Sequence, residues 1–267
     1  MSLVGYDNLK AASKLAKDRE LKTLVIDLER VPGHVRAYDA KVNYLPAVMW
    51  DEQPRTICWA AKWLGEPRKN AEFASVWEQD DDYLAERSFQ LFDEADLVVT
   101  YYGKGADIPW LRAEWTKRHM GEPSSWKDID LYSTVKSRYR LIHKSLNAAA
   151  ELVGVKTKVD KYDFRVADAA VGGDLKAQRR IQRYNTGDIL TTEGVYWGLL
   201  PHIKPHPHIA PNKYMGGLCC PRCSSRDLRR TGQYTPGTYI YAEYRCTQCG
   251  GPFKAEYLTR GPSVRAL

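Results

Sequence analysis

The sequence has no apolar run that approaches the length of a membrane-spanning helix, and its first 22 residues lack the apolar core of a signal peptide. Both absences predict a cytoplasmic protein with no membrane partner. With 43% hydrophobic and 27% charged residues, the composition excludes a disordered chain. The length of 267 residues suffices for one large domain and a small one.

Cysteine is scarce, and its distribution is uneven. Of six cysteines, four form two C-x-x-C pairs, Cys220 with Cys223 and Cys246 with Cys249. Four thiolates suit one tetrahedral structural zinc ion, and the residues between the pairs read as a hairpin that turns at 235–237. Disulfides are the alternative, which a reducing compartment disfavours. The pattern predicts a zinc ribbon at residues 217–267, with Cys219 outside the zinc-binding set.

Excess charge is absent from the first 200 residues, which hold 30 basic and 30 acidic side chains. The net charge of +7 comes from residues 201–267, with ten Lys/Arg against three Asp/Glu. Arginines alternate there with tyrosines, which suits a nucleic-acid strand because cations bind phosphates and rings stack on bases. The alternatives are a hairpin packed by tyrosines and kept in solution by arginines, or a protein-docking surface. The arginines expected to contact nucleic acid are Arg222, Arg229, Arg230 and Arg245.

Residues 23–29 read as a buried central strand that carries two acids. Because strand side chains alternate, Asp27 and Glu29 point the same way. At about 4 Å and an effective dielectric constant near 20, two carboxylates repel each other by roughly 4 kcal/mol. A divalent cation would remove this conflict. The alternative is an edge strand with both acids in water.

The rest of the first 200 residues alternates between strand and helix patterns, which predicts an α/β domain at residues 21–200. It is preceded by a short helix or basic arm at 1–20 and followed by a proline- and histidine-rich linker at 201–216, which we expect to be an extended spacer. Its histidines could also hold a metal. The expected strands are 56–64, 70–77, 96–101 and 128–131, and the expected helices are 81–94, 145–154 and 174–200.

Three further residues fall at positions that suit a shared site. Asp107 follows the strand at 96–101 and lies at or near a helix start, where a simple N-cap is the alternative. Tyr184 and Asp188 are four residues apart in the last helix and therefore share a face.

Taken in order, these acids and the tyrosine resemble the DEDD superfamily of 3′→5′ exonucleases, in its tyrosine-containing branch. The resemblance is carried by residues 25–29, 96–111, 145–155 and 184–188. Residues 59–65 and the cysteine-rich tail are similar to a phage and bacterial subgroup in which a zinc ribbon follows the nuclease. The resemblance implies a ribonuclease-H-like mixed β-sheet flanked by helices, and for a phage protein the cytoplasm of a bacterial host.

The resemblance also implies a two-metal mechanism. Asp27, Glu29 and Asp188 would hold one Mg²⁺ or Mn²⁺, and Asp107 would serve a second ion that Asp27 bridges. The two ions would activate a water molecule and stabilise the departing 3′-oxygen. Tyr184 would orient the attacking water, since a phenol is a poor general base at neutral pH. The product would be a nucleoside 5′-monophosphate from a single-stranded or frayed 3′ end, of DNA rather than RNA.

One departure from the family pattern concerns substrate positioning more than metal binding. The family's second motif usually has asparagine five residues before its aspartate and an aromatic residue just before it, where this chain has Tyr102 and Ala106. Leu28 and Tyr102 are the expected nucleic-acid contacts near the site. No polymerase domain is present, so replication or repair proteins would act in trans. The alternatives are an RNA-trimming exonuclease and a catalytically silent binding module.

Overall fold

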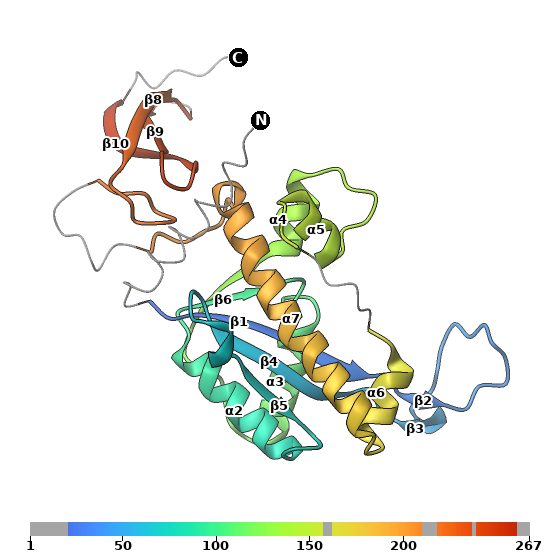
Figure 1. Ribbon diagram of the computed structural model, residues 1–267. Helices are drawn as coiled ribbons and strands as arrows, with labels where there is room; N and C mark the ends of the chain where they lie inside the picture. Colours follow the sequence, from blue (N-terminus) through green and yellow to red (C-terminus); the bar gives the residue numbers. More distant parts are fainter. Residues whose placement is uncertain (1–20, 157–161, 210–217, 237–238, 261–267) are drawn as a thin grey trace.

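Strand β1 (Thr23–Val31) lies at the centre of a five-stranded sheet of order β5-β4-β1-β6-β7 (Figure 1). The computed structural model describes residues 21–156, 162–209, 218–236 and 239–260. The expected helix or arm at residues 1–20 lies outside these ranges. The chain is an α/β protein with a mixed sheet flanked by helices, as the alternating strand and helix patterns predict.

The sheet is antiparallel on one side of β1 and parallel on the other. Strand β4 (Arg55–Trp63) runs antiparallel to β1 and to β5 (Glu72–Ser75), so the expected strands at 56–64 and 70–77 are present and pair with each other. Strands β6 (Leu97–Thr100) and β7 (Lys127–Asp130) are parallel to β1. The carboxyl ends of three parallel strands therefore lie along one side of the sheet.

Alternation along β1 supplies a hydrophobic core on each face of the sheet. Leu24 and Ile26 pack against helices α2 (Asp81–Glu94) and α3 (Asp107–Lys117). Val25 packs on the opposite face against α7 (Leu175–Leu199). Because both faces are covered, the prediction of a central strand is confirmed. Helices α4 (Leu131–Arg138) and α5 (Leu146–Leu152) lie on the same face of the sheet as α7.

Side-chain caps fix several helix starts. Ser145 accepts a hydrogen bond from the backbone of α5, and Asp174 accepts two from the first turn of α7. Helix α6 (Phe164–Val171) is an element that the sequence patterns do not predict. Its buried positions are Ala167 and Ala170, whose small side chains give a weak periodic signal.

Residues 34–52 contain only short elements. Strand β2 (His34–Val35) pairs with β3 (Trp50–Glu52), which follows a 3₁₀ turn, η1 (Ala47–Met49). A second 3₁₀ turn, η2 (Arg68–Asn70), lies between β4 and β5.

The C-terminal module, defined as residues 218–236 and 239–260, is a three-stranded antiparallel sheet of order β10-β9-β8. The pair β8 (Leu228–Tyr234) and β9 (Tyr239–Cys246) confirms the expected hairpin. Strand β10 (Pro252–Arg260) extends this sheet and was not expected.

The described part of the linker is packed, which corrects the expectation of an open spacer. After the 3₁₀ turn η3 (Leu200–His202), Ile203 and Ile209 are buried in the hydrophobic core. Arg222 of the module donates from Nε to the Ile203 carbonyl over 3.3 Å. Although the segment is rich in proline, it packs against the core because burial of its two isoleucines is favourable. Within the described ranges, no helix has the length and hydropathy that crossing a membrane requires.

Candidate metal centres

The first candidate centre is formed by three carboxylates from two elements. Asp27 and Glu29 come from β1, and Asp188 comes from α7, which packs across that strand. One oxygen of each residue lies within 4.8 Å of one oxygen of the other two. Strand alternation places the first two on one side, and helix packing supplies the third. We name these three residues the acidic cluster.

Burial and like charge make the acidic cluster electrostatically unfavourable without a cation. Burial raises the pKa of Asp27 well above its ordinary value, and the charges of Glu29, Asp107 and Asp188 raise it further. Carboxylate oxygens are the ligands that hard divalent cations prefer. The donor set therefore fits Mg²⁺ or Mn²⁺, whose charge would relieve the repulsion.

Asp107 lies beside the acidic cluster and is not part of it. It is the first residue of α3, whose N-cap is Ala106, so the simple N-cap alternative is wrong. Its side chain is buried, and burial raises its pKa to about 7 while Arg30 counteracts the rise. Asp130 raises the pKa of Asp107 further. A carboxyl so poised can bind a cation or take up a proton near neutrality.

Tyr184 lies one turn before Asp188 on α7, and its phenol hydrogen-bonds to that carboxylate. Burial raises the pKa of Tyr184, and the charges of Asp188 and Glu29 add to the rise. The hydroxyl therefore stays protonated at neutral pH, so it can donate a hydrogen bond but cannot act as a base.

Two residues near the acidic cluster were missed by sequence reasoning. Asn185 is fully buried, and its Nδ2 donates to Asp27 Oδ2 over 2.8 Å. The available signal was its position, four residues from the apolar Ile181 and from Ile189, which puts an amide on the buried face of α7. Tyr162 donates to the Arg30 carbonyl, and its ring centroid lies 6.2 Å from that of Tyr184. No sequence signal marked Tyr162.

The two expected nucleic-acid contacts near the site differ in accessibility. Leu28 is 7% exposed and packs in the core, so the structure does not support a side-chain contact with a strand. Tyr102 is 50% exposed, and its ring lies edge-on to Tyr132 with centroids 4.8 Å apart. Its φ of 70° is rare for a residue with a side chain, and its amide donates to Asp130 Oδ1 over 3.0 Å.

The second candidate centre is the group of four cysteines in the C-terminal module. Their Sγ atoms all lie within 4.8 Å of one another, with Cys220 and Cys249 3.7 Å apart and Cys223 and Cys246 3.5 Å apart. Thiolates about 2.3 Å from a tetrahedral zinc ion would lie about 3.8 Å from one another. The spacing therefore fits zinc. Cys219 is buried and lies outside this group.

The module's arginines divide into two kinds. Arg222 donates from Nη1 to the Pro252 carbonyl over 2.8 Å, and Arg245 donates to the Gly250 carbonyl over 3.0 Å. These two guanidinium groups therefore fasten the module's own backbone. Arg229 and Arg230 are exposed neighbours on β8, so they point to opposite faces of the strand.

Both candidate metal centres are inferred from their geometry alone, because sequence comparison adds nothing to it. No protein-family model matches this chain, and no curated protein matches it in sequence.

Proposed function

We propose that this protein is a metal-dependent 3′→5′ exonuclease that releases nucleoside 5′-monophosphates from nucleic-acid 3′ ends. One observation carries the proposal. Asp27 and Glu29, early in the domain's sequence, lie together with Asp188, near the end of that sequence, and one carboxylate oxygen of each lies within 4.8 Å of the others. Such a group of partly buried carboxylates of like charge costs stability unless it holds a cation. The mixed sheet with a central acid-bearing strand supports the proposed ribonuclease-H-like fold.

The chain's own residues have distinct roles in the proposed reaction. Two bound Mg²⁺ or Mn²⁺ ions would supply charge stabilisation and an activated water. Asp27, Glu29 and Asp188 would bind one ion, and Asp107 would bind the second ion on the side of the site next to α3. Tyr184 donates its phenolic hydrogen to Asp188, and its oxygen would orient the attacking water by accepting a hydrogen bond from it. Asn185 fixes the rotamer of Asp27 through its amide.

We propose further that the C-terminal module is a zinc ribbon that assists strand binding. The tetrahedral spacing of its four thiols supports zinc. Its exposed Arg229 and Arg230 can reach phosphates that lie outside the acidic cluster.

The test is the shortening of a 5′-labelled single-stranded oligonucleotide in Mg²⁺ or Mn²⁺. We expect a ladder of products from the wild type and none from Asp27→Asn or Asp188→Asn. Glu86→Gln, an exposed acid on α2, serves as the control and should keep full activity. Matched DNA and RNA strands decide the preferred substrate, for which we propose DNA.

Two results would contradict the proposal. Full activity in both Asp variants would remove the acidic cluster from the reaction. Tight binding of the strand with no nucleotide release, in either metal, would identify a binding module instead.

A further inference from the structure

A cavity of about 420 Å³ lies along the outer edge of the main sheet, away from the three carboxylates of the acidic cluster. Strand β7 ends the sheet on this side, so its backbone edge has no neighbouring strand in the described sheet. The cavity is bounded by β7, by α4, by the loop that precedes α3 and by the packed linker. We name it the edge pocket.

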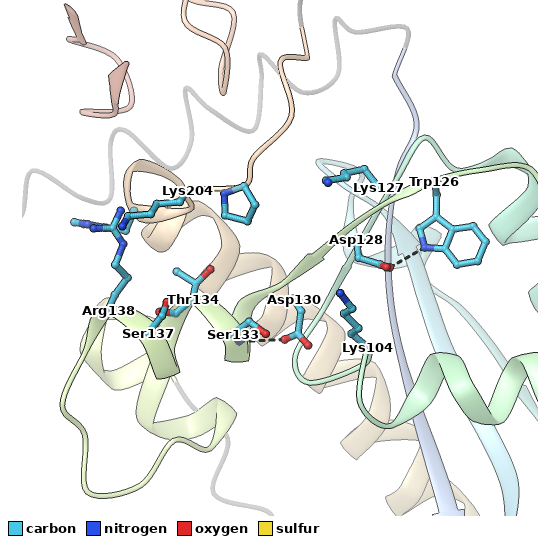
Figure 2. A pocket seen from close by; sticks show the side chains of 12 residues that line it. Lys104, Trp126, Lys127, Asp128, Asp130, Ser133, Thr134, Ser137, Arg138 and Lys204 are labelled. Atoms are coloured by element: carbon cyan, nitrogen blue, oxygen red, sulfur yellow. Dashed lines mark hydrogen bonds between the residues drawn. The ribbon is translucent and has the colours of Figure 1, made fainter. Parts of the chain in front are cut away.

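Four cations line the edge pocket from separate segments of the chain. Figure 2 shows Arg138 and Lys204 on one side of it and Lys104 and Lys127 on the other. None of the four has a carboxylate within ion-pair distance in the described ranges. Cations that converge on a recess without partners create a positive potential that concentrates anions.

The two acids of the edge pocket are engaged by hydrogen bonds from the protein itself. Asp128 accepts from the Trp126 indole over 2.7 Å (Figure 2). Asp130 caps α4 and accepts from the backbone amides of Ser133 and Tyr102. These hydrogen bonds therefore set the orientation of Asp128 and Asp130, and the four cations are left to face an anion in the pocket.

Hydroxyl side chains and a histidine also line the edge pocket. Ser133, Thr134 and Ser137 of α4 line the pocket, and the Ser137 hydroxyl donates to the Thr134 carbonyl over 3.1 Å. Burial of the His202 ring holds its pKa below the usual value, and the nearby charges of Arg138 and Arg222 lower it further. Positive charge thus continues from the pocket toward the C-terminal module.

The edge pocket is linked through Asp130 to Asp107, which lies beside the acidic cluster. Asp130 lines the pocket, and its charge acts on Asp107 beside the cluster. The half-exposed Tyr102 is bonded to Asp130 through its amide and stacks edge-on against Tyr132. A ring at this junction can stack on a base of a strand that crosses it.

From this placement we propose that the edge pocket binds the phosphodiester backbone of the same nucleic-acid strand whose 3′ end enters the acidic cluster. The proposal rests on the exonuclease function proposed above. It assigns Lys104, Lys127, Arg138 and Lys204 as phosphate contacts upstream of the cleaved nucleotide, and Tyr102 as the stacking residue between the two sites.

The test measures strand binding separately from cleavage. A fluorescent oligonucleotide with phosphorothioate linkages at its 3′ end is titrated by anisotropy over a series of salt concentrations. The pocket variant is Lys104→Gln/Lys127→Gln. The matched control is Arg68→Gln/Lys69→Gln, which removes two exposed cations of η2, next to the opposite edge of the sheet.

The expected effect follows from counterion release. Each lost phosphate contact lowers the slope of log K against log salt by about 0.7 for a single strand, so the pocket variant should lose about 1.4. At 0.1 M salt this corresponds to ~25-fold weaker binding. The control should match the wild type. An excess of free nucleoside 5′-monophosphate should displace the strand only weakly, because one phosphate cannot span the pocket's cations.

The outcomes separate the two proposals. Equal slopes for the pocket variant and the wild type would overturn the edge pocket even if cleavage persists. A lowered slope in a protein that releases no nucleotide would uphold strand binding here while the exonuclease function fails.

Discussion

The side-chain amide of Asn185 donates to Asp27 Oδ2 over 2.8 Å and to the Asp27 carbonyl over 3.2 Å. These two residues belong to α7 and β1, the two elements that supply the acidic cluster. The bond ties the helix to the strand at the site itself and favours the ionised form of Asp27. The geometry of the acidic cluster therefore depends on Asn185, an uncharged residue that is not itself one of the candidate metal ligands.

Replacing this amide should weaken cation binding. We expect Asn185→Ala to lower the affinity for Mn²⁺ by about 10- to 100-fold, as for other residues that orient a metal ligand. It should also lower the free energy of unfolding by about 1–3 kcal/mol, because Asp27 loses a buried partner. Thr191→Val, which removes a buried hydrogen bond to Gly187 on the same helix, is the control. Titration with Mn²⁺ by electron paramagnetic resonance should show an effect only in the Asn185 variant.

Removal of the Tyr184 hydroxyl should affect the reaction and leave the cation in place. For Tyr184→Phe we expect kcat to fall by about 10²-fold through misplacement of the water. Mn²⁺ affinity should stay within a factor of two or so, since the phenol is no ligand in this site. The control is Tyr162→Phe, which alters the neighbouring ring in the same way. Equal loss in both variants would show that removing either hydroxyl disturbs the site in the same way, so that the Tyr184 hydroxyl has no special role.

The metal-free protein should become less stable as pH rises. Burial raises the pKa of Asp107 from 3.8 to about 7. Below pH 3.8 the carboxyl is protonated in both the folded and the unfolded chain, so it has no effect. Between these values only the unfolded chain releases the proton, which lowers folding stability until the folded group ionises near pH 7.

Asp107→Asn should remove this part of the pH dependence. In buffer without divalent cations, we expect the variant to gain Tm relative to the wild type at pH 8 and to match it at pH 4. Each kcal/mol of unfavourable free energy that the substitution removes should raise Tm by about 2–4 °C in a domain of this size. Scanning calorimetry at the two pH values is the measurement. A gain of the same size at both would show that the carboxyl does not titrate in this range.

Zinc removal should unfold the C-terminal module and leave the main domain folded. All eight tryptophans lie between residues 50 and 197, so their fluorescence reports chiefly on the main domain. We expect Cys246→Ser to lose bound zinc, measured by elemental analysis, with unchanged tryptophan emission. Cys219→Ala should retain one zinc per chain. Zinc at full stoichiometry in Cys246→Ser would exclude the proposed ligand set.

The ion pair between Lys62 and Glu193 should be a strong brace between β4 and α7. Its Nζ to Oε2 distance is 2.7 Å, with the two side chains 0% and 14% exposed. We expect Glu193→Ala to cost about 3–5 kcal/mol, because it leaves a buried ammonium unpaired. The exposed pair Lys22–Glu94 has a distance of 2.6 Å, yet Glu94→Ala should cost less than about 1 kcal/mol. Urea unfolding of both variants gives the comparison.

Local signals in the sequence were sufficient for most elements of the main domain. The apolar run before Asp27 predicted a central strand, Ser145 and Gly154 bounded a helix, and the C-x-x-C spacing predicted a four-thiol group. The strand, the helix and each C-x-x-C pair depend on neighbours within a few residues, where chain geometry alone decides which side chains share a face.

Tertiary structure decided the features that depend on distant partners. Asn185 meets Asp27 from 158 positions away, and the edge pocket joins Lys104 to Lys204. Helix α6 is placed by alanine packing, and the linker by the burial of two isoleucines. No local pattern encodes such contacts, because they form only when the free energy of burying the core brings the elements together. The sequence thus determined which residues could bind cations, and packing determined which of them meet.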